Sequence, residues 1–192
     1  MELDASKNYI VSGLERSGTS MLMQMLYNGG YPVAADDKRL PDKNNPKGYF
    51  ELEGGKIINK LIENNFSFTK YKGKIIKITA YGMKYLPPGD YTIIYSERNI
   101  DEILDSMEKM AQITDENRSE TKDVFLKLND YIKQHLINRS DCTVLFVNYN
   151  EILNNPEKQV KTINDFLQKE KADVKAMINT VDENLYRNRK FK

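Results

Sequence analysis

The residues best suited to chemistry lie near the start of the chain, in segment 11–20 (VSGLERSGTS). Gly13, Gly18 and Ser20 occupy three positions of the phosphate-binding pattern G-x-x-x-x-G-K-[ST]. Thr19 stands where that pattern has a lysine. In enzymes that act on nucleoside triphosphates, this lysine neutralises the reacting phosphates. The segment therefore predicts an anion site of a different kind.

The residue types of this loop explain how it could hold an anion. At a helix N-terminus the first backbone N–H groups lack partners within the helix, and the helix dipole adds partial positive charge. Glycines let the backbone curl around a ligand, and the hydroxyls of Ser17, Thr19 and Ser20 add donors. Arg16 is the nearest cation, and its planar guanidinium suits a tetrahedral oxyanion without a metal. The alternative is a glycine turn that binds nothing.

A second group of candidate residues follows a strand-like segment in the middle of the chain. Arg98 comes after the apolar run 91–96 (YTIIYS), and Ser106 lies eight residues later in a helical stretch. Eight residues are about two helical turns, so both side chains can face one anion at the carboxyl end of a strand. As the alternative, Arg98 is a surface ion-pair residue and Ser106 a small packing residue.

The hydrophobic pattern predicts the elements that must position these residues. Apolar runs indicate strands at 8–12, 74–79, 91–96 and 143–147. Helical periodicity indicates helices at 20–28, 51–64, 99–111, 118–137, 156–168 and 173–179. Segment 31–48 is polar and turn-rich, and we expect a functional or mobile loop there. Strands that alternate with helices predict a parallel sheet covered on both faces, in a single domain spanning 1–192.

Composition and charge limit the functions that are open to the chain. With 29 Lys+Arg against 28 Asp+Glu, the formal net charge of +1 gives no overall field that would recruit nucleic acid or an anionic membrane. A single cysteine, Cys142, and a single histidine, His135, favour a metal-free fold in a reducing compartment. The N-terminus lacks an apolar signal segment, and no apolar run approaches the roughly 20 residues of a membrane span. We expect a cytoplasmic monomer or homodimer without nucleic-acid or membrane partners.

At 13–20 (GLERSGTS) the loop resembles that of the P-loop sulfotransferases, especially short bacterial sulfotransferase-like proteins with a G-x-P-R-S-G-T-S loop. Glu15 departs from that pattern, because it replaces a proline and puts an acid beside the anion site. Other segments similar to the family are 95–101 followed by Ser106, 45–51 (NPKGYFE) and 181–189 (VDENLYRNR). The resemblance implies a three-layer α/β/α fold of the P-loop nucleoside-triphosphate-hydrolase type, with four to five parallel strands.

The resemblance also implies a donor, 3′-phosphoadenylyl sulfate, with 3′-phosphoadenosine 5′-phosphate (PAP) as its product. The residues that would hold the 5′-phosphosulfate are those of the loop, namely Gly13, Glu15, Arg16, Ser17, Gly18, Thr19 and Ser20. Arg98 and Ser106 would hold the 3′-phosphate. The basic, glycine-containing loop that grips this phosphate in better-studied members is not evident, and Arg187 and Arg189 are either its substitutes or part of a solvated basic tail. Arg16 would stabilise charge on the leaving phosphate, without a metal.

Sulfuryl transfer also needs a general base within hydrogen-bond reach of the acceptor. Glu51 is our candidate, and the alternative is an acid that stabilises the first turn of its own helix. His135 lies far in sequence from the anion motifs, and Asp36 and Asp37 are typical of a solvated loop. The acceptor would be a small molecule or glycan that offers a hydroxyl or an amine.

Two other functions remain open at this point. A metal-dependent nucleotide kinase of the same fold would need the missing lysine and a strand-end carboxylate for magnesium, for which Glu97 is the only candidate. A non-catalytic protein could keep the anion cradle and transfer nothing.

Overall fold

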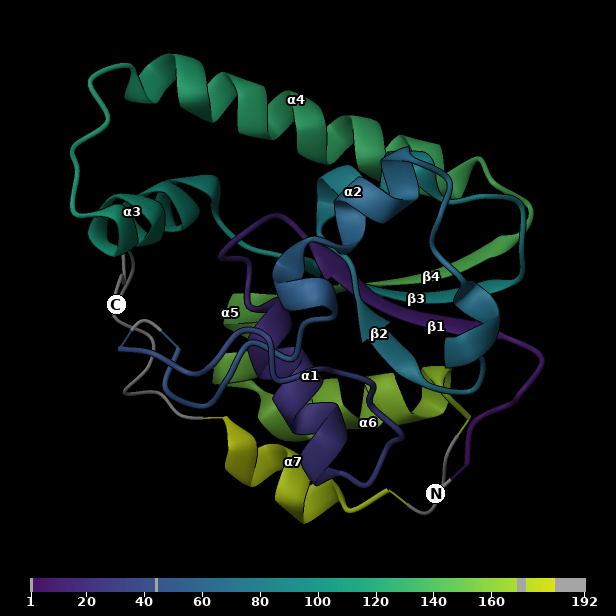
Figure 1. Cartoon of the computed structure of the whole chain (residues 1–192). Helices are drawn as coiled ribbons and strands as arrows, with labels where there is room; N and C mark the ends of the chain where they lie inside the picture. Colours follow the sequence, from purple (N-terminus) through teal and green to yellow (C-terminus); the bar gives the residue numbers. More distant parts are fainter. Residues whose placement is uncertain (1, 44, 169–171, 182–192) are drawn as a thin grey trace.

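The computed structural model describes residues 2–43, 45–168 and 172–181 of the chain. In this part of the chain, one sheet contains four parallel strands, β1 (Asn8–Gly13), β2 (Ile75–Lys77), β3 (Tyr91–Glu97) and β4 (Cys142–Asn148). Their order is β2-β1-β3-β4, so β1 and β3 are central. Helices cover both faces of the sheet and give three layers (Figure 1). The predicted parallel α/β architecture is confirmed.

Each face of the sheet has its own hydrophobic core. Successive residues of β1, Ile10 and Val11, belong to opposite cores, as the alternation of side chains along a strand requires. On the Val11 face lie α1 (Thr19–Asn28), α5 (Tyr149–Asn154), α6 (Pro156–Phe166) and α7 (Val174–Thr180). On the Ile10 face lie α2 (Ile57–Ile62), α3 (Ile100–Ala111), α4 (Arg118–Ile137) and the 3-10 turn η3 (Ala80–Tyr85). Burial on both faces explains why the strands read as continuous apolar runs.

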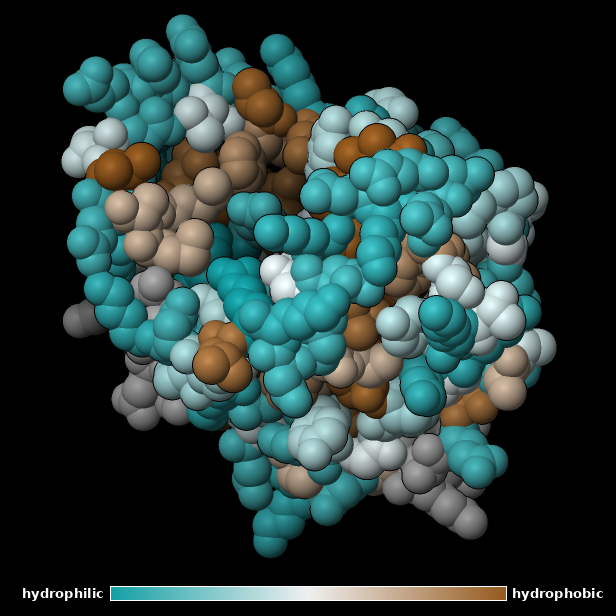
Figure 2. All heavy atoms as spheres, in the orientation of Figure 1, coloured by the Kyte–Doolittle hydropathy of each residue, from teal (hydrophilic) through white to brown (hydrophobic). Residues whose placement is uncertain are grey.

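The surface over α3 and α4 exposes more hydrophobic residues than the surface over the middle of the molecule (Figure 2). Only Ile132 and Leu136 of α4 are fully buried, and both belong to its C-terminal half. Phe125 and Leu128, nearer its start, pack only partly against the core. Figure 2 shows hydrophobic residues exposed between α3 and α4, beside a mostly hydrophilic central surface. No helix in the described ranges combines the length and apolar character needed to cross a bilayer.

The prediction of a helix at 51–64 is wrong for the first half of that segment. The segment forms a 3-10 turn, η1 (Glu53–Gly55), followed by the short helix α2. Glu53, Gly54 and Gly55 all have positive φ angles, of 56°, 61° and 86°, which an α-helix cannot accommodate. The apolar spacing at 57–62 was real, but it extends over only six residues.

Other predicted boundaries also shift. β2 keeps only three residues of the predicted 74–79, and the helix predicted at 156–168 ends at Phe166. Helix α5 was not predicted. It starts directly after β4 because the side chain of Asn148 accepts hydrogen bonds from the N–H groups of Asn150 and Glu151. A further 3-10 turn, η2 (Phe68–Tyr71), precedes β2.

In the loop between β1 and α1, the backbone at two glycines lies very close to neighbouring residues. A Cβ on Gly13 would lie 2.5 Å from Ser17 Oγ and 2.6 Å from the carbonyl oxygen of Ser96. Gly18 caps α1 with a φ of 100°, and a Cβ there would lie 2.2 Å from the ring of Tyr149. Both glycines of the motif are therefore required by packing, and not only by backbone conformation.

We expect Gly18→Ala to lower the free energy of unfolding by about 1–3 kcal/mol more than Gly30→Ala does. Gly30 is a matched control, because its φ is also positive, at 83°, but no atom lies within 4 Å of an added Cβ. Both variants have the cost of a left-handed alanine, and only Gly18→Ala adds the clash with Tyr149. Urea denaturation measures the difference. Equal losses in the two variants would contradict the packing argument.

Candidate active site

A cavity of about 280 Å³ lies at the carboxyl ends of the strands. Its lining includes Arg16 after β1, Lys77 at the end of β2, Arg98 after β3 and Tyr149 after β4. Residues of the 39–55 segment and of α3 complete the wall. Open parallel sheets bind ligands at this edge, because the loops and helix N-termini that follow the strands meet there.

Most of the sequence-predicted site residues meet at this cavity. Its lining includes Glu15, Arg16, Gly18, Thr19, Ser20, Glu51, Arg98 and Ser106. Gly13 and Ser17 do not line the cavity, and Ser17 is fully buried. Arg187 and Arg189 lie outside the described residues. His135 is on α4, where it stacks on Tyr131, and does not line the cavity.

The loop leaves polar groups available to an anion. No side chain caps the first N–H groups of α1, because the N-cap residue is Gly18. Ser17 Oγ is buried and has no hydrogen-bond partner among the described residues, although the Ser17 carbonyl accepts a hydrogen bond of 2.7 Å from Ser96 Oγ. A buried hydroxyl without a partner is destabilising. Since Ser17 does not line the cavity, the loop residues that an anion in the cavity can reach include Gly18, Thr19 and Ser20.

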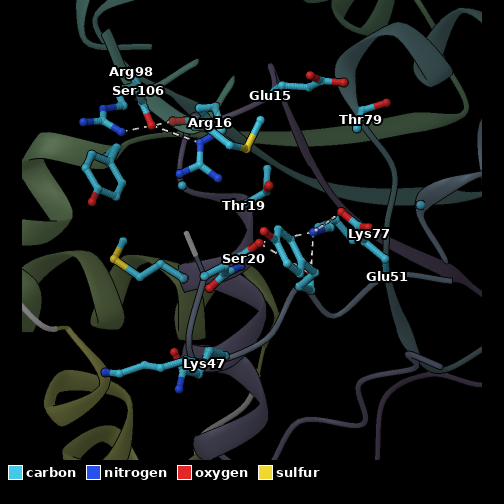
Figure 3. A pocket seen from close by; sticks show the side chains of 18 of the residues that line it. Glu15, Arg16, Thr19, Ser20, Lys47, Glu51, Lys77, Thr79, Arg98 and Ser106 are labelled. Carbon is cyan, nitrogen blue, oxygen red and sulfur yellow. Dashed lines mark hydrogen bonds and ion pairs between the residues drawn. The ribbon is translucent and has the colours of Figure 1, made fainter. Parts of the chain in front are cut away.

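The two anion motifs contact each other directly. Arg16 Nε donates to Ser106 Oγ at 3.0 Å, across 90 residues of sequence. Arg98 Nη1 donates to the carbonyl oxygen of Arg16 at 3.1 Å. Figure 3 shows the three side chains converging at one side of the cavity. Burial lowers the pKa of Arg16, and this guanidinium makes no ion pair within the described part of the chain. A partly desolvated cation without a carboxylate partner favours an incoming anion.

Arg98 is held by a buried ion pair. Its Nε lies 3.0 Å from Glu102 Oε2, and the two side chains are 8% and 0% exposed. Asn150 Nδ2 donates to the other oxygen of Glu102 at 3.3 Å, and the Arg98 guanidinium lies 4.5 Å from the centre of the Tyr149 ring. The ion pair that the sequence offered as an alternative for Arg98 thus exists, but it is buried and borders the cavity.

Lys77 is a site residue that the sequence analysis missed. It ends β2 beside Val11 of β1, and its side chain is only 4% exposed. Its ammonium lies 3.2 Å from Ser20 Oγ and 2.9 Å from Glu51 Oε1, and donates to the carbonyl oxygen of Tyr49. Burial lowers the pKa of Lys77, and Glu51 opposes that effect. The available signal was a lysine at the end of an apolar run, since lysine is seldom fully buried without a partner.

Glu51 lies at the centre of a charged cluster. One carboxylate oxygen pairs with Lys77 and the other with Arg39 Nη1, each at 2.9 Å. The Arg39 guanidinium lies 3.5 Å from the centre of the Tyr49 ring, and the Tyr49 hydroxyl donates to Asp42 at 2.9 Å. Glu51 precedes η1 and belongs to no helix, so the alternative of a helix-stabilising acid is wrong. The cluster ties the predicted loop to β2 and to the anion site.

Glu15 has a different position from the one expected for an acid in the anion loop. It lines the cavity, but its side chain points away from Arg16 and towards Thr79 (Figure 3). Within the described part of the chain it makes no hydrogen bond or ion pair. The acid therefore does not neutralise the guanidinium next to it in sequence.

Comparisons with known proteins point to one fold. No protein-family model matches the sequence, and no curated protein matches it. Among solved structures, the sulfotransferase domain of the Synechococcus PCC 7002 olefin synthase is similar over 97% of this chain and 84% of its own, with a TM-score of 0.59 and 13% identity. The chain has the fold of the sulfotransferases, which is of the P-loop nucleoside-triphosphate-hydrolase type.

Two further sulfotransferase structures agree with this assignment of the fold. Mouse sulfotransferase SULT7A1, complexed with PAP, is similar over 97% of this chain and 68% of its own, with a TM-score of 0.54 and 14% identity. The sulfotransferase domain from the curacin biosynthetic pathway is similar over 92% and 78%, with a TM-score of 0.54 and 11% identity. At these identities the similarity shows the fold alone.

We expect Glu102→Gln to lower the free energy of unfolding by about 3 kcal/mol, because it leaves the buried guanidinium of Arg98 without its counter-charge. Asp165→Asn is the control, since Lys161 and Asp165 form another i,i+4 pair, with side chains 77% and 65% exposed. Loss of that pair costs about 0.5 kcal/mol or less. Denaturant unfolding compares the two, and a small, equal effect would show that the Arg98 pair does not hold the site together.

Proposed function

We propose that the protein is a sulfotransferase that moves a sulfuryl group from 3′-phosphoadenylyl sulfate to a hydroxyl or amine of a small-molecule or glycan acceptor. The observation that carries this proposal is the hydrogen bond between Arg16 and Ser106, which joins two anion motifs 90 residues apart in sequence. Two such motifs at one cavity suit a donor with two separate anionic groups. Mouse sulfotransferase SULT7A1, which shares the fold, was crystallised with PAP.

The charges around the cavity support a polyanionic donor. Six basic side chains line the cavity, namely Arg16, Arg39, Lys47, Lys77, Arg98 and Lys109. Among the described residues, only two acidic side chains do so, Glu15 and Glu51. The whole chain has a formal net charge of only +1, so positive charge is concentrated at this site. A local excess of one sign attracts the oppositely charged ligand.

The donor fits the groups that the site offers. The uncapped N–H groups of α1, the hydroxyls of Thr19 and Ser20, and Arg16 would hold the 5′-phosphosulfate. Ser106 and the cavity-facing part of Arg98 would hold the 3′-phosphate. When bound, the donor supplies the transferable sulfuryl group and a phosphate as leaving group. Arg16 and the N–H groups would stabilise the negative charge that grows on that phosphate.

Lys77 and Glu51 are proposed to act on the acceptor side. Lys77 provides a buried ammonium next to the hydroxyl of Ser20, on the loop that lacks a lysine of its own. We propose that it stabilises charge on the sulfuryl oxygens and that Glu51 takes the proton of the acceptor. Glu51 can accept a proton only if it gives up one of its two ion pairs, with Lys77 or with Arg39. Proton transfer is thus coupled to a rearrangement of this cluster.

The kinase alternative has less support from the site. Its candidate magnesium ligand, Glu97, lies at the end of β3 but is paired with Lys133 on α4 at 2.5 Å and does not line the cavity. The lysine position of the loop is occupied by Thr19, and Lys77 reaches Ser20, the residue that would hold the metal in a kinase. An ammonium at that hydroxyl opposes a second cation there.

We expect PAP to bind more tightly than ATP with magnesium in isothermal titration calorimetry. Arg16→Ala should weaken PAP binding by about tenfold or more, because a charge-assisted hydrogen bond to phosphate is lost. Arg16→Lys keeps the charge and serves as the matched control. Tight binding of ATP with magnesium and none of PAP would refute the sulfotransferase proposal and favour the kinase.

We expect Lys77→Met to reduce turnover of labelled donor by about 10²–10³-fold, with a pool of cell metabolites as acceptors. Its PAP affinity should stay near that of the wild type, because PAP lacks the sulfuryl group. Burial lowers the pKa of Lys77 below its usual 10.5, so wild-type turnover should decline with rising pH before that value, as the ammonium loses its proton.

Three results would count against this role of Lys77. Equal losses of PAP affinity and of turnover would place Lys77 at the phosphate instead of the sulfuryl group. Unchanged turnover in Lys77→Met would remove it from the reaction. PAP binding by the wild type without any transfer would favour the non-catalytic alternative.

A further inference from the structure

The edge of the cavity along α3 carries a lysine without an assigned role. Lys109 lines the cavity three residues after Ser106, in the last turn of α3. Side chains three residues apart on a helix lie on the same side, with about 5–6 Å between their Cβ atoms. The cavity side of α3 therefore presents a hydroxyl and an ammonium one turn apart.

The acids of α3 that could neutralise Lys109 are engaged elsewhere. Glu108 Oε2 pairs with Arg118 at 2.9 Å, and its Oε1 accepts from the N–H group of Asp115 at 3.0 Å. Asp105 also pairs with Arg118, at 2.5 Å. Within the described residues, Lys109 itself makes no hydrogen bond or ion pair. Its positive charge therefore remains available at the cavity.

The other groups at this edge supply little net charge. Arg98 is offset by the buried carboxylate of Glu102, and Ser106 is neutral. Arg16 uses its Nε on Ser106, and its guanidinium is assigned to the 5′ side of the donor. A phosphate monoester carries about 1.5 to 2 negative charges near pH 7. Lys109 is the cavity-lining cation of α3 that can balance such a group.

We propose that Lys109 recognises the 3′-phosphate of the donor and sets a preference for 3′-phosphorylated nucleotides over those with a free 3′-hydroxyl. This rests on the proposed function. The basic, glycine-containing loop expected to grip that phosphate is not evident in the sequence, and α3 supplies a cation next to Ser106. A helix fixes the position of this cation relative to the hydroxyl.

The test compares PAP with adenosine 5′-phosphate, which lacks the 3′-phosphate, by calorimetry on the full chain. Lys109→Met should weaken PAP binding by about tenfold and leave adenosine 5′-phosphate binding unchanged. Lys109→Arg should keep most of the PAP affinity, and Lys109→Gln is a second variant without the charge. Lys127→Met, on the exposed part of α4, removes the same charge away from the cavity and should change both affinities by less than about twofold.

The possible outcomes separate the two proposals. Suppose that the wild type binds PAP, and that Lys109→Met weakens the binding of PAP and of adenosine 5′-phosphate equally or changes neither affinity. The role of Lys109 is then overturned and the proposed function stands. If Lys127→Met weakens PAP as much as Lys109→Met does, the effect is one of overall charge, and the role is again overturned. If the wild type does not bind PAP, the proposed function fails, and the role of Lys109 fails with it.

Discussion

The guanidinium of Arg98 contacts four parts of the structure that border the cavity. It follows β3, donates to the loop carbonyl of Arg16, pairs with Glu102 on α3 and lies over the ring of Tyr149 on α5. A buried charge must be paired and hydrogen-bonded, so these partners cannot move independently without exposing or orphaning it. The same tyrosine ring packs so closely on Gly18 that it fixes the start of α1. The shape of the anion site thus depends on one desolvated cation.

The second half of the site is organised around a buried carboxylate. Glu51 holds Lys77 and Arg39 together, and in this way draws the 39–51 segment over the ends of β1 and β2. Without Glu51, two cations would lie close together in a partly buried place, which their mutual repulsion opposes. The pairing therefore makes it possible to gather positive charge at the cavity before a ligand arrives.

Sequence reasoning succeeded where local pattern and long-range contact agree. The strands were recognisable because both faces of the sheet are covered, and the loop because its glycines have strict packing requirements. The shared location of Arg98 and Ser106 at one cavity was predicted from the family resemblance together with their spacing of about two helical turns. Apolar periodicity failed at Glu53–Gly55, where positive φ angles break the helix that the following residues suggested.

Other features depend on contacts that no local pattern contains. Lys77 becomes a site residue only because the register of β2 sets it beside Val11 of β1, next to the anion loop. The pairing of Glu51 with two cations needs the whole 39–51 segment to fold back on β2. For Lys109, the sequence shows the spacing from Ser106 but not the ion pair between Glu108 and Arg118. Because Glu108 pairs with Arg118, it does not neutralise the charge of Lys109 at the cavity.

The loop has no lysine of its own, so the lysine beside it comes from another element. In this protein the loop offers backbone N–H groups, hydroxyls and Arg16, and the lysine comes from the neighbouring strand, where Glu51 fixes it. A lysine held from the strand side approaches Ser20 from the side opposite to Arg98 and Ser106 (Figure 3). Arg98 and Ser106 on one side and Lys77 on the other are thereby separated across one cavity in Figure 3. Glu15 does not oppose the neighbouring guanidinium of Arg16, because its side chain points towards Thr79 (Figure 3).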